Sequence, residues 1–521
     1  MIFRIHAGKS DDDKKWFLYD NETNTLSDEK GFVYKLPDNV PMTESPPVVG
    51  DNQGYVEIKR DRPENSGALK VGTIKADVND FQIKEVVPFS KDVPLKKSKT
   101  PTILKIQLGL SCNYSCEYCS QRFVDRPEET NRKDVEGFME KLENFEFSEE
   151  AGLKIEFWGG EPMVYWKTIV PLVEALNEKF KDWTKKPRYS MITNGSLFTP
   201  EKCQWLYDQG FSIGMSHDGP GQHVRGPDPF DDPEQKKIIL DFYKLMQPEG
   251  RISFNCMLNA QNISRKEIHN WFIDLTGDPE VGLGEGSLVD AYDEGGLELS
   301  LTTKKEHFEF RKKAFADIHD NEGFIGFGGI VQKVNYFVFN MLNQSNAKFI
   351  GQKCGMDKED TIAVDLRGDV ITCQNVSSVE TAMNGESHKA GNITDIDAVE
   401  IKTATHWRNR PHCSECPVVQ LCQGSCMYLQ GEHWYTSCAN SYSDNIVFFA
   451  LAFKQVTGYM PVYIDADFLP PERRDIWGIA LWHTEDPPKK KAFPIKVVSE
   501  KKIVNDQVVY ERSKVIKVEN I

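Results

Sequence analysis

The sequence predicts an α/β protein built on a sheet of parallel strands, with β-rich segments at both ends and a cysteine-rich region toward the C-terminus. Between about residues 101 and 290, short apolar runs alternate with stretches of helical periodicity. Repeated βα units of this length imply a parallel sheet, either open or partly closed as a barrel. The chain has 521 residues. Domains usually hold roughly 100–200 residues, so we expect two large domains plus extensions.

The elements follow in order. Residues 1–100 form a β-rich extension, with strand-like runs at 16–19 and 31–34 separated by turn residues and with linkers at Pro46-Pro47 and residues 91–101. Six candidate strands come next, at 103–108, 153–158, 188–193, 211–216, 251–257 and 280–284. Apolar residues between these strands recur at helical spacing, as in residues 135–145. A helix is expected at 442–453, and strand-like runs surround Val497 and Val509.

Chemistry-bearing motifs follow successive strands. The first strand leads into Cys112, Cys116 and Cys119, and the second leads into the turn Gly159-Gly160-Glu161-Pro162. Asn194 ends the third strand and Ser216 ends the fourth. Ligands of parallel sheets bind at the carboxyl ends of the strands, so the sequence predicts one site there.

The first three cysteines have C-x3-C-x2-C spacing. Three thiolates on one loop cannot complete a tetrahedral zinc site. They can hold three corners of a [4Fe–4S] cube and leave the fourth iron free. In the following turn, glycines allow close approach of carbonyl groups, and Glu161 offers a carboxylate to an ammonium group.

A second set of cysteines begins at Cys354. It continues with Gly368, Cys373, the run C-x2-C-x5-C-x3-C and one further cysteine, giving Cys413, Cys416, Cys422, Cys426 and Cys438. Four of these in isolation could bind zinc, but that interpretation explains neither the others nor the first loop. Cys203 and Cys256 lie among helical and strand residues, where we expect buried free thiols.

Together these motifs resemble the radical S-adenosylmethionine (SAM) enzymes. The pattern C-x3-C-x-aromatic-C, with Tyr118 as the aromatic residue, the GGEP turn and the S-x-D-G-P run at Ser216 carry the resemblance, and the later cysteines are similar to the SPASM extension. The resemblance covers about residues 101–445 and implies a partial (β/α)6 barrel. The implied domains are an N-terminal extension (1–100), the barrel (101–320), a helical linker (321–353), the SPASM domain (354–445) and a C-terminal extension (446–521).

The resemblance also implies cofactors. SAM chelates the free iron, and one electron cleaves it to a 5′-deoxyadenosyl radical that removes a hydrogen atom from substrate. The implied SAM contacts are Tyr118, Gly159, Gly160, Glu161, Pro162, Asn194 and Ser216. Three [4Fe–4S] clusters are implied, one SAM-binding and two auxiliary. Their ligand sets are Cys112, Cys116 and Cys119; Cys413, Cys416, Cys422 and Cys438; and Cys354, Cys373 and Cys426. The last set is one ligand short, which leaves an open iron or a ligand such as Asp357.

The same resemblance implies a peptide or protein substrate, modified by crosslinking, epimerisation or oxidation, and an electron donor such as flavodoxin or ferredoxin. The N-terminal extension is a candidate substrate-recognition module. Gln374 stands where sulfatase maturases carry an acidic proton acceptor, which disfavours that activity. A small-molecule radical dehydrogenase and a non-catalytic iron–sulfur scaffold remain alternatives, although a scaffold needs no SAM contacts. Glu285, Asp290 and Tyr292 are candidate bases or donors, and Arg225 is a candidate partner for a carboxylate or a surface salt bridge.

Charge and hydropathy exclude other classes. The net charge of −16 disfavours nucleic-acid binding, which needs a basic stripe. The N-terminus lacks the apolar core of a signal peptide, and we see no apolar run long enough to span a bilayer. We therefore expect a cytoplasmic protein without a membrane partner, in which clustered cysteines bind metal rather than form disulfides. Whether the β-rich ends pair with each other is left open.

Overall fold

The computed structural model describes residues 1–9, 12–35, 55–58, 74–77, 85–284, 286–319, 328–478, 501–504 and 507–510. It divides into two units, residues 1–478 and 479–521. In the second unit, β18 (Lys501–Val504) and β19 (Gln507–Tyr510) form an antiparallel hairpin. The strand predicted around Val509 is thus present. The run around Val497, the prolines at 46–47 and Glu285 lie outside the described residues.

The first unit is built on an eight-stranded sheet with the order β12-β11-β10-β9-β8-β13-β14-β15. The strands from β12 to β13 run parallel, whereas β14 and β15 pair antiparallel. Their bounds are β8 (Ile103–Gln107), β9 (Lys154–Trp158), β10 (Arg188–Thr193), β11 (Ser212–Ser216), β12 (Ile252–Asn255), β13 (Thr361–Asp365), β14 (Asp369–Ile371) and β15 (Lys389–Asn392). The predicted parallel α/β sheet and its first five strands are confirmed.

The sixth predicted strand is wrong in detail. Residues 280–284 form no strand, and only the isolated bridges Phe254–Leu283 and Leu258–Leu288 extend the parallel pairing. Gly282 and Gly284 explain the weakness of this edge, since glycine offers no side chain to pack within a strand. On the opposite side, β13 from the cysteine-rich region pairs in parallel with β8, which the sequence did not predict.

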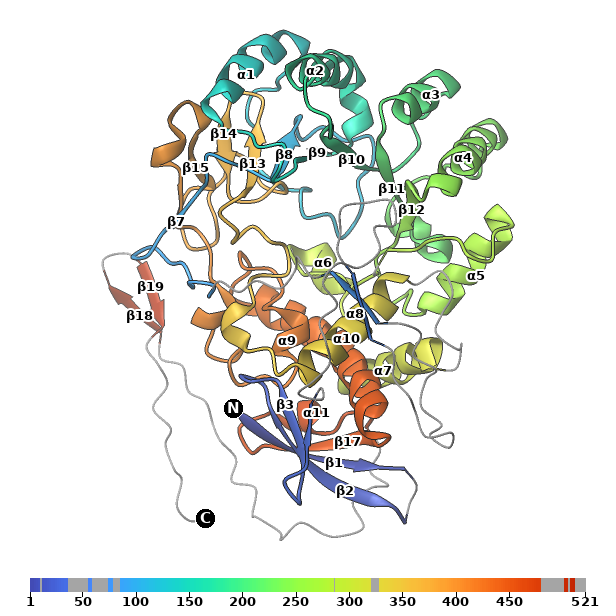
Figure 1. The fold of residues 1–521 in the computed structure, drawn as a ribbon, viewed down its shortest axis with the longest axis vertical. Coiled ribbons are helices and arrows are strands. Elements are labelled where there is room, and N and C mark those ends of the chain that lie inside the picture. The colour runs from blue at the N-terminus through green and yellow to red at the C-terminus, as the bar shows by residue number, and fades with distance from the viewer. Residues whose placement is uncertain are drawn as a thin grey trace. The chain divides into compact units, whose positions relative to one another are not determined.

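Five helices follow the parallel strands and form an arc outside them (Figure 1). They are α1 (Val135–Lys141), α2 (Trp166–Lys179), α3 (Pro200–Asp208), α4 (Pro233–Met246) and α5 (Arg265–Thr276). Three of them begin at side chains that accept a hydrogen bond from the first turn, namely Thr199, Asp232 and Ser264. The apolar stripe of α2 (Ile169, Leu172, Val173, Leu176) is fully buried.

The N-terminal strands form a second sheet, with the order β17-β1-β2-β3-β4. Their bounds are β1 (Ile2–Gly8), β2 (Lys14–Asp20), β3 (Thr25–Asp28), β4 (Val33–Tyr34) and β17 (Met460–Asp465). β1 pairs antiparallel with β17, so the N-terminal sheet gains a strand from beyond the cysteine-rich region, whereas the strand predicted around Val509 belongs to the separate hairpin of β18 and β19. Phe17 and Tyr19 pack edge-on against Phe453 and Phe449 of α10 (Gly431–Thr457).

Helix α10 is longer than the predicted helix at 442–453 and includes Cys438. Its residues 446–453 are buried on all sides, as expected of a helix that is apolar all round. The remaining elements are β5 (Tyr55–Ile58), β6 (Ile74–Asp77), β7 (Leu95–Lys96), β16 (Glu400–Ile401), α6 (Glu294–Glu298), α7 (Lys304–His319), α8 (Gly328–Leu342), α9 (Val419–Cys422) and α11 (Pro471–Arg474).

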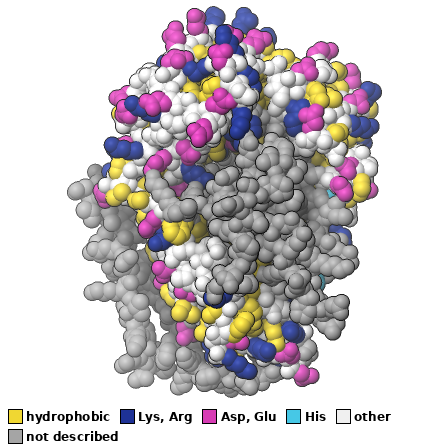
Figure 2. All heavy atoms as spheres, in the orientation of Figure 1, with side chains coloured by type: hydrophobic (Ala, Val, Ile, Leu, Met, Phe, Trp, Pro, Cys, Tyr) yellow, Lys and Arg dark blue, Asp and Glu magenta, His cyan; other side chains and the backbone are white. Residues whose placement is uncertain are grey.

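The described surface carries mixed charge. On the face shown in Figure 2, acidic and basic side chains are interspersed rather than gathered into one stripe. Within the part of the chain that the structure describes, no helix combines the length and the apolar character needed to cross a membrane.

Candidate active site

The cysteine loop and the ends of the parallel strands line one cavity of about 910 Å³ that opens to solvent. Its lining includes Cys112, Cys116, Cys119, Gly159, Gly160, Glu161, Pro162, Asn194 and Ser216. The structure thus brings together every residue that the sequence singled out at this edge except Tyr118, which does not line the cavity. Their individual roles in binding the cluster and SAM stay predictions.

The glycine turn lies directly against the cysteine loop. The amide of Gly160 donates to the carbonyl of Gly109 (3.2 Å), and that of Glu161 donates to the carbonyl of Ser111 (3.0 Å). A Cβ on Gly160 would lie only 2.5 Å from the carbonyl oxygens of Leu110 and Ser111. Only glycine permits this approach, so the turn fixes the position of the cysteine loop.

Glu161 is buried and joins the ends of two strands. Its Oε1 accepts from the hydroxyl of Thr193 (2.6 Å) and the amide of Met163 (2.9 Å), while Oε2 accepts from the amide of Asn194 (2.8 Å). Burial raises the pKa of Glu161, and these three hydrogen bonds oppose the rise. Each carboxylate oxygen has two lone pairs, and Oε1 already accepts two hydrogen bonds, so Oε2 is the oxygen that retains capacity for a cationic ligand.

Asn194 serves as a turn residue and also contacts the cysteine loop. Its Oδ1 accepts from the amide (3.0 Å) and hydroxyl (2.6 Å) of Ser196, and its Nδ2 donates to Asn113 (3.0 Å). This side chain therefore holds the third strand end against the loop that carries the first cysteines.

Arg225 is a buried cation beside the first cysteine group. Its Nη1 donates to the hydroxyl of Tyr118 (2.7 Å), which in turn donates to Asp218 (2.5 Å). Burial raises the pKa of Cys116 to about 11, and the guanidinium of Arg225 acts against this rise. Of the two predicted roles, a surface salt bridge is wrong for Arg225, since its side chain is only 12% exposed and lies 3.7 Å from the buried Asp218.

Several residues in the cavity were missed by the sequence analysis. Among them are Gln121, Arg122, Arg126 and Asn375. Asn375 follows Cys373, so the cysteine-rich region contributes to the wall of this site. The arginines after Cys119 were detectable as a basic pair beside the motif, whereas Asn375 gave no sequence signal.

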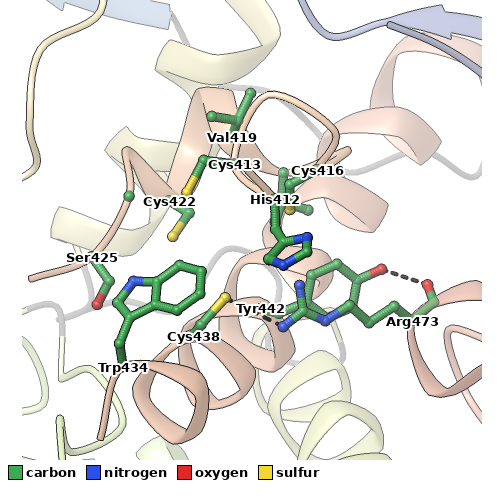
Figure 3. A pocket seen from close by; sticks show the side chains of 12 residues that line it. His412, Cys413, Cys416, Val419, Cys422, Ser425, Trp434, Cys438, Tyr442 and Arg473 are labelled. Atoms are coloured by element: carbon green, nitrogen blue, oxygen red, sulfur yellow. Dashed lines mark hydrogen bonds between the residues drawn. The ribbon is translucent and has the colours of Figure 1, made fainter. Parts of the chain in front are cut away.

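A second cavity is lined by Cys413, Cys416, Cys422 and Cys438. Figure 3 shows the sulfur atoms of Cys413, Cys422 and Cys438 directed into the space between Trp434 and His412. Four cysteines around one space match the donor set of a [4Fe–4S] cube. Asn21, in the turn between β2 and β3, supports this loop, because its Nδ2 donates to the carbonyls of Ser414 and Cys416 (both 2.9 Å).

Cys354, Cys373 and Cys426 form a third group. Burial, together with the nearby thiols of Cys354 and Cys426, raises the pKa of Cys373 to about 12. Tyr292 and Tyr428, both partly buried, face this group, and Tyr292 hydrogen-bonds to Cys426. Asp290 instead accepts from Ser425 (3.0 Å).

Asp357 lies close to Cys354. Its Oδ2 accepts from the amide of Gln352 (2.7 Å) and lies 3.4 Å from Nε2 of His406. Its Oδ1 is buried and has no hydrogen-bond partner among the described residues. A buried oxygen without a partner is costly, so this atom is a candidate ligand for the incomplete third group.

Within each cysteine group, the side chains are too far apart to bind one metal ion together. Among the described residues, no three His, Cys, Asp or Glu side chains come close enough to hold one metal ion. Zinc requires each sulfur at about 2.3 Å. A [4Fe–4S] cube distributes its ligands over four irons, so it fits these donor sets better than zinc does. The remaining thiols, Cys203 and Cys256, are buried, as expected.

Residues 106–268 match the family model of the radical SAM superfamily, which confirms the resemblance seen in the sequence motifs. The chain therefore contains a radical SAM domain, whose family implies a [4Fe–4S] cluster and SAM.

Individual proteins are more distantly similar. The radical SAM cyclopropyl synthase TigE of Paramaledivibacter caminithermalis is 23% identical over 350 residues, covering 62% of this chain and 68% of that protein. An uncharacterized protein of Methanothermobacter thermautotrophicus is 28% identical over 181 residues, covering 32% of this chain and 61% of that protein. The solved structure of native anSMEcpe with bound AdoMet has a TM-score of 0.50 at 19% identity and covers 69% of this chain and 99% of that one. This last likeness concerns the fold.

Proposed function

We propose that this chain is a radical SAM enzyme that installs a modification on a peptide or protein substrate by means of three [4Fe–4S] clusters. The observation that carries the proposal is the division of ten cysteines into three separate groups, one of which shares a cavity with the glycine turn at the strand ends. A scaffold for structural metal would not need that turn, so its position against the cysteine loop favours the enzyme.

The first cysteine group would hold the SAM-binding cluster, and the turn from Gly159 to Pro162, together with Asn194 and Ser216, would hold SAM. When bound, this pair supplies a 5′-deoxyadenosyl radical that abstracts a hydrogen atom from an unactivated carbon. The hydrogen bonds that Glu161 accepts from Met163, Thr193 and Asn194 hold its carboxylate in place at this site. Arg225 places a buried positive charge beside the thiolates and so favours their ionised form.

A peptide substrate is supported by the chemistry at the cavity wall. Arg122 and Arg126 line the cavity, and the neighbouring Phe123 is 67% exposed, with the guanidinium of Arg122 4.9 Å from its ring centre. Aromatic and arginine side chains are enriched where proteins bind other chains. The modification is a crosslink, an epimerisation or an oxidation, and the similarity to a cyclopropyl synthase favours carbon–carbon bond formation.

For the third cysteine group, we propose a non-cysteine fourth ligand or an open iron. The partnerless Oδ1 of Asp357 near Cys354 supports the first of these. Asp357→Ala would then leave the iron content unchanged but alter the spectrum of one auxiliary cluster. An unaltered spectrum would favour an open iron.

The enzyme assignment is tested on anaerobically purified protein, with dithionite and SAM supplied. We expect roughly twelve irons per chain, four for each cube, and formation of 5′-deoxyadenosine. Cys116→Ala should abolish 5′-deoxyadenosine, whereas Cys203→Ala should not. Zinc in place of iron, or turnover that survives Cys116→Ala, would refute the assignment and favour a scaffold.

The substrate class is tested by co-expression with peptides encoded beside this chain, followed by mass spectrometry and stereochemical analysis. A crosslink or oxidation changes the peptide mass, and an epimerisation changes residue chirality only. The Cys116→Ala variant, co-expressed in parallel, should leave the peptide unmodified. If 5′-deoxyadenosine forms but no peptide is altered, a small-molecule radical dehydrogenase is favoured instead.

A further inference from the structure

An arginine from the C-terminal end of the first unit reaches the second cysteine group. Arg473 lies in α11, beyond the cysteine-rich region, and its Nη2 donates a hydrogen bond to Sγ of Cys438 at 3.3 Å. The same side chain lines the cavity of Cys413, Cys416 and Cys422. In Figure 3 it lies beside His412 and Tyr442, with its guanidinium directed toward Cys438.

The arginine is held in place from two sides. The hydroxyl of Tyr442 donates to the carbonyl of Arg473 at 2.5 Å, and the guanidinium lies 4.9 Å from the centre of the Tyr442 ring. Arg311 of α7 donates to three carbonyls of the same segment, those of Glu472 (3.0 Å), Asp475 (3.2 Å) and Ile476 (3.3 Å). The donor is therefore fixed by the fold and is not a freely moving surface side chain.

We propose that Arg473 raises the reduction potential of the auxiliary cluster held by Cys413, Cys416, Cys422 and Cys438, an inference that rests on the proposed function. A cluster gains one negative charge on reduction. Hydrogen bonds and positive charge at a ligand sulfur stabilise that charge, and such bonds set cluster potentials. The bond from a guanidinium to a thiolate is charge-assisted and hence stronger than a neutral one.

Arg473 differs from Arg410, another cation near this group. Arg410 is also buried, but its Nη2 donates to the carbonyls of Cys426 (3.2 Å) and Leu429 (2.8 Å) rather than to a sulfur. Arg410 thus contributes charge alone, whereas Arg473 contributes charge and a bond to a ligand atom. The segment that ends the first unit therefore serves as part of the redox site.

The test is a potentiometric titration with dithionite in which electron paramagnetic resonance measures the reduction of each cluster. It uses a parent variant in which Cys112, Cys116 and Cys119 are all alanine, so that only auxiliary clusters contribute. On this parent, Arg473→Gln should make one cluster at least tenfold harder to reduce, a shift of about 59 mV for a one-electron couple. The second auxiliary signal should not move.

The matched control is Arg474→Gln. Arg474 is the next residue, but it pairs with Asp465 and Asp467 (both 3.5 Å) and should leave both potentials unchanged. Arg473→Lys keeps the charge without the planar fork and should give a smaller negative shift, and it is the variant to use if Arg473→Gln loses iron.

Unchanged potentials in both Arg473 variants at full iron content would overturn the inference, as would an equal shift in Arg474→Gln. Those outcomes would leave the proposed function standing. A parent variant without auxiliary iron would instead refute the proposed function, and this inference with it.

Discussion

Arg265 of α5 and Asp444 of α10 form a buried ion pair between the radical SAM domain and the helix that carries Cys438. Nη2 of Arg265 lies 2.8 and 2.9 Å from the two carboxylate oxygens of Asp444. The two side chains are 0% and 4% exposed. Arg265 begins α5, the helix that follows β12, so the pair couples the parallel sheet to the helix of the auxiliary cysteine.

Arg265→Met should destabilise the protein by about 3–5 kcal/mol, because it leaves the carboxylate of Asp444 buried without its partner. The first unfolding transition in urea measures this loss. Lys237→Met is the control, since its partner Asp241 is exposed, and such pairs contribute at most about 1 kcal/mol. Equal losses in the two variants would show that Asp444 finds another partner.

Gly160→Ala should displace the cysteine loop, because its Cβ would meet the carbonyls of Leu110 and Ser111 at 2.5 Å. A misplacement of this size costs on the order of 100-fold in rate, so 5′-deoxyadenosine formation should fall by that factor. Gly137→Ala in α1 meets no atom within 4 Å and should retain full activity. If both variants matched the parent, the turn would not position the loop.

Cys426→Ala should remove one auxiliary cluster and leave the other. Cys426 follows Cys422 by four residues but groups with Cys354 and Cys373, whereas Cys422 lines the cavity with Cys438. Cys426→Ala and Cys422→Ala should each lose about four irons, and they should lose different electron paramagnetic resonance signals. Loss of the same signal in Cys426→Ala and Cys422→Ala would contradict this grouping.

Glu380 should make stability fall as the pH rises. Burial raises the pKa of Glu380 from 4.5 to about 7, with Asp125 adding to the rise, and its Oε2 is buried without a hydrogen-bond partner among the described residues. Between these two values the folded state holds a proton that the unfolded state has lost, so unfolding becomes easier with rising pH.

Glu380→Gln should therefore raise the melting temperature relative to the parent more at pH 8 than at pH 5. Glu178→Gln, at a side chain that is 72% exposed, should change the melting temperature equally at pH 5 and pH 8. A Glu380→Gln effect that does not vary with pH would mean that the carboxyl titrates normally.

The local features of the site could be read from the sequence. The first five parallel strands, the cysteine loop after β8 and the turn at Gly159-Gly160 depend on neighbouring residues, because hydrophobic periodicity and glycine turns are short-range signals. The sixth strand was overestimated because a short apolar run does not reveal how poorly two glycines pack at a sheet edge. The division of the later cysteines was implied only by family resemblance.

The sequence by itself determined the α/β sheet, the radical SAM motif and the presence of a second cysteine set. Tertiary structure alone decided that β13 joins β8, that β1 pairs with β17, and that Arg473 reaches Cys438. It also decided the pairing of Arg265 with Asp444, which are 179 residues apart. Such contacts depend on how whole helices and sheets pack, and no local pattern of residue types encodes which distant side chain will fill a buried space.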